Sequence, residues 1–428
     1  MFHAHRDPVC RMAAFAAAAA AILWPVQGSA EVWRWVQFVP GGAEVRAATD
    51  EPECPGLEID GAPAAMTVRA PASDAFPVLI CAKPLPAGAK HASIGDVPLP
   101  LPRPAPNRIV IVGDTGCRLK EKQQDCNDIV AWPFKLGATI GATFKPDLVL
   151  HVGDFHYRET ACATGKNGCA GSPFGDTWDV WREDFFAPAS SLLQAAPWIM
   201  VRGNHEVCDR GGHGWARALD PYPFDPATGN AGCLPAAKPY TVDIGGVTIE
   251  VMDVASAGEV KADEAQLPLY REMFAFANTI EGPVWQTFHR PVWASNGNTD
   301  KAKQVDNKTL AAAAEGNIPA NVQAFISGHI HTFQVMEYDG DLPLQIVSGH
   351  GGDDLAMKAP EVVKGLTING VTVKEGMAKP GVFGFSILER TPGDGPADTG
   401  GTWTLTGYDT FARPFGVCTI IGRAVDCH

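Results

Sequence analysis

The stretch RIVIVGDTG (residues 108–116) is a short apolar strand pattern that runs into a glycine and an acid. The stretch DLVLHVGDFHY (residues 147–157) repeats that order. Residues 127–144, between the two, have a helical pattern despite Pro133. A buried strand, a helix and a second buried strand form a β-α-β unit with parallel strands. The sequence therefore predicts an α/β fold in which two neighbouring strands each end in an acidic residue.

Three more apolar runs also end in polar residues. They are Trp198–Val201 before GNHE (203–206), Pro283–Phe288 before His289, and Val322–Ser327 before GHIH (328–331). The other expected strands are Tyr240–Ile244, Val247–Val254, Thr332–Tyr338, Leu344–Ser348, Val382–Glu389 and a last β region at Trp403–Ile421. Ligands of open α/β sheets bind outside the carboxyl ends of the strands. We therefore expect all five polar clusters to meet at one edge.

Residues 31–105 have a different pattern. Short alternating apolar runs are separated by turns rich in proline and glycine, which is typical of a small β-rich domain. The segment 98–106 contains five prolines in nine residues and is expected to be a stiff linker. We therefore assign residues 31–105 to a β-rich N-terminal domain with its linker, and 106–428 to the α/β domain.

Residues 1–30 have the pattern of a secretory signal peptide. Arg6 and Arg11 precede an apolar run from Met12 to Val26, and Gly28-Ser29-Ala30 supplies small residues at the expected cleavage site. The run is shorter than the roughly 20 residues that span a bilayer. A cleaved signal predicts a secreted or periplasmic protein without a stable membrane anchor, and an uncleaved anchor helix is the alternative.

The cysteines agree with an oxidising compartment. Of 11 cysteines, Cys10 lies in the signal, and ten remain. These form neighbouring pairs: Cys54/Cys81, Cys117/Cys126, Cys162/Cys169, Cys208/Cys233 and Cys418/Cys427. The pattern favours five disulfides, although spacing alone leaves their connectivity open. A zinc site is the alternative, but no Cys-x-x-Cys spacing occurs.

The composition excludes some classes of partner. The chain has 428 residues, 46% hydrophobic and 19% charged, and a formal net charge of -14. These values describe a globular protein with a large core. The acidic balance argues against nucleic acid as a specific partner, because such binding needs a basic surface. It leaves phosphate chemistry open, since a metal ion supplies local positive charge.

The residues at the strand ends suit two metal ions. A binuclear site needs carboxylate, imidazole and amide donors, with one carboxylate holding ions about 3.5–4 Å apart. The strand ends offer such donors together with a phenol: Asp114, Asp154, Tyr157, Asn204, His289, His329 and His331. Each has an ordinary explanation alone, such as a turn or a helix cap. Seven of them in this order favour a metal centre.

The ordered set GDTG, GDFHY, GNHE, His289 and GHIH resembles the calcineurin-like metallophosphoesterase superfamily, and most closely the purple acid phosphatases. The motifs extend from residue 108 to 331, over half of the chain. The resemblance implies a four-layer α/β sandwich, with two central sheets and helices outside, after a small N-terminal β-rich domain. It makes residues 106–428 the catalytic domain.

The resemblance also implies the metals. Asp114, Asp154, Tyr157 and His331 would hold a first ion, with Asp154 bridging to a second ion held by Asn204, His289 and His329. Most of the superfamily has Asp-x-His in the first motif, but here Gly116 stands at the histidine position and Tyr157 follows the bridging acid. A phenol needs a strongly Lewis-acidic ion to bind as phenolate at neutral pH. We therefore expect Fe(III) in the first site, and Zn, Fe or Mn(II) in the second.

The activity that the resemblance implies is hydrolysis of a small phosphorylated substrate by metal-activated hydroxide. His205 would contact the phosphate and protonate the leaving group, and Glu206 would orient His205 or its loop. The segment 290–300 lacks the further histidines of the plant enzymes, and Arg290 is a candidate replacement. The alternatives are a phosphodiesterase or nucleotidase on the same scaffold, or a secreted, non-catalytic binding protein stabilised by metal.

Four other histidines are assigned outside the metal centre. His151 is expected in the core and His156 is a candidate cleft residue. His213 is expected to be exposed in a glycine-rich loop, and His350 to lie in a structural turn.

Overall fold

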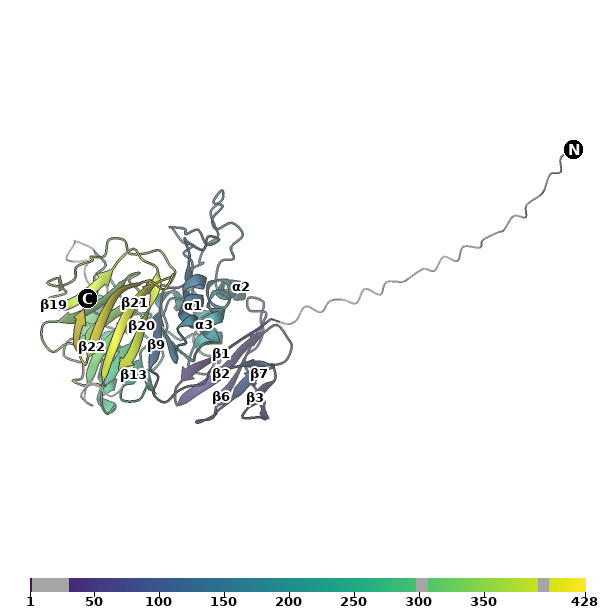
Figure 1. Ribbon diagram of the computed structural model, residues 1–428, viewed down its shortest axis with the longest axis horizontal. Helices are drawn as coiled ribbons and strands as arrows, with labels where there is room; N and C mark the ends of the chain where they lie inside the picture. Colours follow the sequence, from purple (N-terminus) through teal and green to yellow (C-terminus); the bar gives the residue numbers. More distant parts are fainter. Residues whose placement is uncertain (2–30, 298–306, 392–399) are drawn as a thin grey trace. The chain divides into compact units, whose positions relative to one another are not determined.

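The computed structural model describes Met1 and residues 31–297, 307–391 and 400–428. The expected secretory signal at residues 1–30 therefore lies, except for Met1, outside the described residues. Residues Glu31–His428 form one compact unit (Figure 1). Within the described ranges, no helix combines the length and the apolar character needed to cross a membrane.

The larger central sheet, which we call sheet A, has eleven strands in the order β23-β22-β21-β20-β9-β10-β11-β1-β2-β6-β5. Strands β9, β10, β11 and β1 are parallel, and the remaining pairs are antiparallel. The strands span β1 Val32–Val39, β2 Gly42–Thr49, β5 Thr67–Ala70, β6 Leu79–Leu85, β9 Arg108–Val112, β10 Leu148–His151, β11 Trp198–Met200, β20 Gly384–Thr391, β21 Thr402–Asp409, β22 Pro414–Ile421 and β23 Ala424–Cys427.

The second central sheet, sheet B, has eight strands in the order β12-β13-β14-β15-β17-β16-β19-β18. Strands β13, β14, β15 and β17 are parallel. The strands span β12 Tyr240–Asp243, β13 Thr248–Val251, β14 Val284–Thr287, β15 Val322–Ser327, β16 Phe333–Tyr338, β17 Leu344–Ser348, β18 Thr367–Ile368 and β19 Val371–Lys379.

Alternation along the strands produces four layers. One core cluster joins the facing sides of the two sheets, including Ile111 of β9 and Ile326 of β15. The other side of sheet A packs on α1 (Phe134–Thr143) and α3 (Ala187–Leu193), and the other side of sheet B on α5 (Leu267–Ala275) and α6 (Lys308–Ala314). The shorter helical segments are α2 (Trp178–Trp181), η1 (Arg182–Phe186), η2 (Asn204–Glu206), α4 (Gly212–Gly214), η3 (Trp215–Leu219) and η4 (Phe276–Thr279). The predicted four-layer α/β sandwich is confirmed.

The helix expected over residues 127–144 begins later than the sequence pattern indicated. Helix α1 spans Phe134–Thr143, with Pro133 at its N-cap position. Proline has no N–H to donate, and it disfavours helical geometry in the residue before it. The preceding segment instead turns back on itself, because the Asp128 carboxylate accepts the backbone N–H groups of Val130 and Ala131.

The N-terminal β-rich region continues sheet A. Strand β1 pairs in parallel with β11 through Gln37 and Trp198, and β2, β6 and β5 follow β1 in the sheet. Figure 1 shows β1, β2 and β6 side by side. A separate four-stranded sheet in the order β4-β3-β7-β8 lies in the same region; it consists of β3 Leu57–Ile59, β4 Ala62–Ala64, β7 Ala92–Ile94 and β8 Val97–Pro98. The β-rich character is confirmed, and the domain boundary between residues 105 and 106 stays a prediction.

The ten cysteines from Cys54 to Cys427 form five disulfides, all between neighbouring cysteines in the sequence. They are Cys54–Cys81, Cys117–Cys126, Cys162–Cys169, Cys208–Cys233 and Cys418–Cys427. Five disulfides fit a protein that folds in an oxidising or extracellular compartment.

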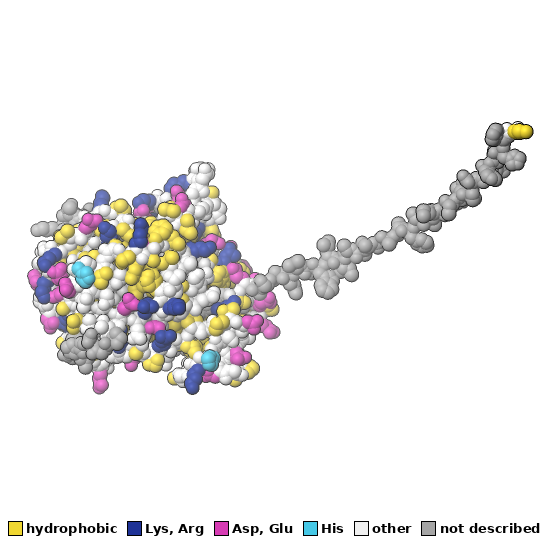
Figure 2. Space-filling model, in the orientation of Figure 1, with side chains coloured by type: hydrophobic (Ala, Val, Ile, Leu, Met, Phe, Trp, Pro, Cys, Tyr) yellow, Lys and Arg dark blue, Asp and Glu magenta, His cyan; other side chains and the backbone are white. Residues whose placement is uncertain are grey.

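Charged side chains of both signs are mixed over the face that Figure 2 displays. The net charge of -14 is therefore not concentrated in one acidic block on that face. This mixture gives no support to a broad basic surface for nucleic acid there.

Candidate metal centre

The five polar clusters follow β9, β10 and β11 of sheet A and β14 and β15 of sheet B, at the carboxyl ends of these parallel strands. Three non-glycine residues in them have left-handed backbone geometry: Asp114 at φ 55°, Asp154 at φ 58° and His329 at φ 69°. Such conformations are costly and tend to occur at functional sites. These sharp turns direct the segments that follow the strands of both sheets towards one cluster of side chains.

Tyr157 joins one group of the predicted ligands. Its phenolic oxygen lies 3.1 Å from Asp114 Oδ1, 2.9 Å from Asp154 Oδ2 and 3.1 Å from His331 Nε2. The residue is 1% exposed. His331 Nε2 is also 3.3 Å from Asp114 Oδ1. Four donor atoms from three separate motifs thus surround one position.

The backbone explains why a glycine stands at position 116. A Cβ on Gly116 would lie 2.6 Å from the carbonyl oxygen of Phe155 and 2.9 Å from the nitrogen of Tyr157. No real Cβ tolerates such distances to backbone, so an imidazole is excluded unless the two loops separate. The buried Asp184 carboxylate also ties these loops together, because it accepts the N–H groups of Cys117 and Tyr157.

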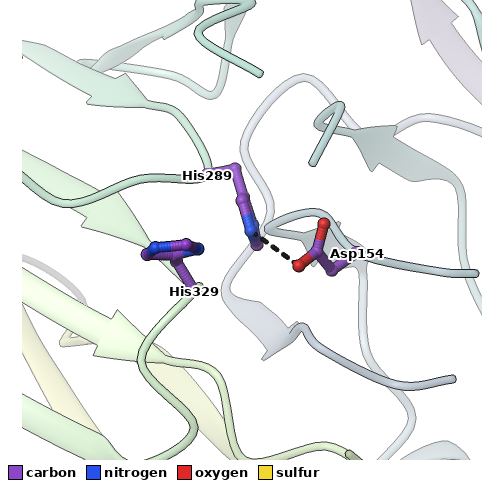
Figure 3. Close-up of side chains that lie close together, drawn as sticks. All are labelled: Asp154, His289 and His329. Carbon is purple, nitrogen blue, oxygen red and sulfur yellow. Dashed lines mark ion pairs between the residues drawn. The ribbon is translucent and has the colours of Figure 1, made fainter. Parts of the chain in front are cut away.

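The second group surrounds His289. His289 Nε2 lies 3.0 Å from Asp154 Oδ2 and 3.1 Å from Asn204 Oδ1. Its Nδ1 is 2.8 Å from the carbonyl oxygen of Val152, so Nδ1–H donates there and Nε2 faces the carboxylate. Ligand atoms of Asp154, His289 and His329 all lie within 4.8 Å of one another. Figure 3 shows the His289 side chain between His329 and Asp154.

Asp154 belongs to both groups through the same oxygen, Oδ2. The two groups therefore meet at one carboxylate, as two neighbouring cations require of a bridging ligand. Carboxylate, imidazole, phenol and amide donors suit hard and borderline cations. All seven predicted ligand residues come together, and their donor set fits two metal ions.

The electrostatics of the cluster favour cations. Burial lowers the pKa of His289, but the Asp154 and Asp114 carboxylates outweigh it and raise the pKa to about 9. Likewise, burial lowers the pKa of His331, but Asp353 and Asp114 raise it to about 9. Burial raises the pKa of Tyr157 well above its usual value, and the negative charges of Asp154, Asp114 and Asp353 raise it further. The carboxylates thus stabilise positive charge in the cluster, and a bound metal ion would supply that charge.

His205 and Glu206 have separate tasks. The His205 ring lies against the ring of Tyr157, with centroids 3.8 Å apart, and its Nδ1 is 2.7 Å from Glu159 Oε1. Burial lowers the pKa of His205 to about 4. The Glu206 carboxylate accepts four backbone N–H groups, from Gly203 and residues 154–156. Glu206 therefore braces the loop that carries Asp154, and it makes no such contact with the His205 ring.

The model of the calcineurin-like phosphoesterase family matches residues 107–333, which include every motif of the cluster. The chain belongs to this family. Its activity is accordingly that of a metal-dependent phosphoester hydrolase, and a family member of this kind carries a dimetal centre and acts on phosphorylated substrates.

Solved structures agree with this family in fold. A purple acid phosphatase, PPD1 from yellow lupin (Lupinus luteus) seeds, matches with a TM-score of 0.52 and 14% identity, over 91% of this chain and 74% of that one. The structure of PhoD matches with a TM-score of 0.52 and 10% identity, over 92% of this chain and 91% of that one. No curated protein sequence matches the chain. At these identities, the likeness concerns the fold alone.

The family resemblance did not indicate two acids, Asp353 and Glu259, that contact the predicted ligands His331 and His329. Asp353 Oδ2 is 3.2 Å from His331 Nδ1, and its carboxylate accepts a hydrogen bond from Arg118 Nε at 3.0 Å. Asp353 follows β17 in the segment GHGGDD (349–354), the same order of strand, glycine and acid as the metal motifs. That signal was present in the sequence. Glu259, behind His329, also follows a strand and a glycine, β13 and Gly258, but it lies farther from the end of its strand, within a long connection.

The remaining candidates do not belong to the seven-residue cluster. Arg290 forms a salt bridge with Glu259, so this cation is already paired. His151 is buried as expected, and its Nε2 is 3.0 Å from Thr115 Oγ1. His156 is buried, with Nε2 3.0 Å from the carbonyl oxygen of Gly175, which removes it as a cleft residue. His350 is fully buried in the segment that follows β17, and its place in a structural turn stays a prediction.

Proposed function

We propose that this phosphoesterase hydrolyses small phosphate esters at a binuclear Fe(III)–M(II) centre like that of purple acid phosphatases, where M is Zn, Fe or Mn. The position of the Tyr157 phenol carries the proposal, because its oxygen lies within 3.1 Å of two carboxylates and His331 Nε2. A phenolate at neutral pH requires a strong Lewis acid, and the resemblance to purple acid phosphatases makes Fe(III) the candidate ion.

In this proposal, Asp114, Asp154, Tyr157 and His331 hold the first ion, and Asn204, His289 and His329 hold the second, with Asp154 shared. When bound, the two ions supply charge for the phosphoryl oxygens and acidify a water molecule to hydroxide. The backbone bracing by Glu206 keeps Asp154 in the position where both ions can share it.

His205 is the proposed contact to the phosphoryl group. Its Nδ1 is 2.7 Å from Glu159 Oε1, and its Nε2 lies 2.9 Å from Arg210 Nη2 and 3.9 Å from Asp154 Oδ2 of the centre. Nε2 of the protonated ring is the atom from which a proton would reach the leaving-group oxygen. Glu159 Oε1, at 2.7 Å from Nδ1, would stabilise the protonated ring during that step.

Metal analysis combined with a visible spectrum of the purified protein tests the first site. We expect iron and a broad band from phenolate-to-iron charge transfer, and we expect Tyr157→Phe to abolish the band while the protein remains folded. Phenylalanine keeps the ring that packs against His205 and removes only the oxygen. An active wild-type enzyme that contains no iron would contradict the ferric site.

Substrate comparison tests the ester class. We expect the enzyme to hydrolyse a nitrophenyl phosphate monoester faster than the corresponding bis-ester. The reverse order would favour the phosphodiesterase or nucleotidase alternative on the same scaffold.

We also propose export with cleavage of the signal after Ala30, which the five disulfides support. The intact mass of the exported protein tests this proposal. A mass that begins at Glu31 is expected, and a mass that includes residues 1–30 would contradict cleavage.

A further inference from the structure

Glu259 lies directly behind one of the proposed ligands of the second ion. Its Oε1 is 3.2 Å from His329 Nε2 and 3.0 Å from Arg290 Nη2. The residue belongs to the segment 252–266, which connects β13 to α5 by turns and bends. This long connection brings a carboxylate to the metal centre from outside the five motifs.

The contact decides which nitrogen of His329 remains for a metal. When Nε2–H donates to Glu259 Oε1, the lone pair for coordination is on Nδ1. A carboxylate behind a ligating imidazole fixes both its tautomer and its orientation. The compact group within 4.8 Å consists of Asp154, His289 and His329 and does not include Glu259. The carboxylate is thus placed to hold the ligand and not to replace it.

Arg290 keeps the Glu259 carboxylate in this position. The arginine side chain is 11% exposed, and it is anchored at its other end because Nη1 donates to the carbonyl oxygen of Ala257. Arg290 also follows His289 directly in the sequence. The pair Arg290–Glu259 therefore connects His289 and His329, two of the proposed ligands of the second ion.

We propose that Glu259 is a positioning residue for the second metal ion: it orients His329 for coordination and is itself held by Arg290. The inference rests on the proposed function for the identity of the metal site. The inference predicts that loss of Glu259 weakens binding of the second metal ion, an effect that can be measured without substrate.

The test is equilibrium dialysis of the metal-free protein against graded free Zn²⁺, with zinc per chain measured for the wild type, Glu259→Ala and Glu259→Gln. The expected result for Glu259→Ala is one zinc bound as in the wild type and the other bound about ten- to a hundredfold more weakly. Glutamine also accepts a hydrogen bond from Nε2–H, so Glu259→Gln should recover part of the affinity. Glu264→Gln, an exposed acid of the same segment, is the matched control and should bind both ions normally.

Three results would overturn the inference: unchanged zinc binding in Glu259→Ala, equal weakening of both ions, or no recovery in Glu259→Gln. Wild-type protein that binds fewer than two ions would instead contradict the proposed function, so the two failures are distinguishable. Glu259→Gln, which has the same shape as the wild type, serves if the alanine variant does not fold.

Discussion

The half of the metal centre around His331 and the half around His329 are supported from behind in different ways. His331 Nδ1 faces the Asp353 carboxylate at 3.2 Å and the carbonyl oxygen of Asp354 at 2.6 Å, and the Asp353 side chain is 0% exposed. His329 faces Glu259, whose side chain is 37% exposed. Water competes with a hydrogen bond at an exposed carboxylate and has no access to a buried one. The comparison teaches that the first half is the rigid one, and we expect the second ion to exchange faster.

The largest expected effect comes from the residue that both halves share. Asp154→Asn removes the negative charge next to both Tyr157 Oη and His289 Nε2. We expect both ions to bind more weakly and kcat/KM to fall about 10³-fold, in the range for loss of a preorganised electrostatic group. Metal content and steady-state rates check this, with Asp179→Asn on the exposed side of α2 as a control. Loss of only one ion would refute the shared role of Asp154.

The next effect separates the two halves. Asp353→Asn leaves Arg118 without its charged partner at a mostly buried position, and we expect destabilisation of about 3 kcal/mol. It should also weaken the first ion about ten- to a hundredfold and leave the second nearly unchanged. Urea unfolding and metal titration measure the two effects.

Asp354→Asn is the control for that experiment. Its carboxylate pairs with the exposed Lys122, whereas its backbone carbonyl holds His331, so the substitution leaves the contact to His331 in place. We expect a change of less than about 1 kcal/mol. Equal effects of Asp353→Asn and Asp354→Asn would show that Asp353 does not support the first half.

The smallest effect concerns the loop that carries Asp353. His350 is fully buried against Phe333 and Phe415, and burial lowers its pKa to about 3. Among the residues that the structure describes, neither ring nitrogen has a hydrogen-bond partner. In the unfolded chain a histidine pKa is about 6.5. As the pH falls, the unfolded state therefore binds a proton to His350 before the folded state does. The contribution of the neutral histidine to the free energy of unfolding is fully present above about pH 6.5 and is lost as the pH falls towards 3.

Between pH 7 and pH 5 this loss amounts to about 2 kcal/mol. We expect His350→Leu to remove that part of the pH dependence of the free energy of unfolding in urea. An unchanged pH dependence in His350→Leu would show that another group destabilises the protein in acid.

Much of the fold could be predicted because its inner strands carry a strong local signal. Strands β9, β15 and β17 have the predicted bounds, since a run of buried apolar residues ends at a glycine or a polar cluster in each. The pairing of β1 with β11 could not be predicted. It joins residues far apart in the sequence, and neither strand carries a local sign of its partner. The start of α1 was missed because the periodic pattern continued through Pro133.

The candidate site was predictable for a related reason. Residues such as Asp114 and His331 lie at strand ends, and parallel strands bring their ends to one edge whatever the details of packing. The supporting acids depend on loop paths. Asp353 carries the same local order as the motifs, whereas Glu259 reaches His329 by a connection whose course only the packed structure determines. Their importance for the metal site is the prediction that these experiments test.

The parallel pairing of β1 with β11 has a practical consequence for anyone who wishes to shorten the chain. A fragment that begins at residue 106 would retain every motif, yet it would leave the N–H and C=O groups of β11 without a neighbour on one side. Open strand edges recruit other chains, so the fragment would tend to aggregate. Because the turn with Asn204 begins a few residues after β11, the damage would start next to the metal ligands.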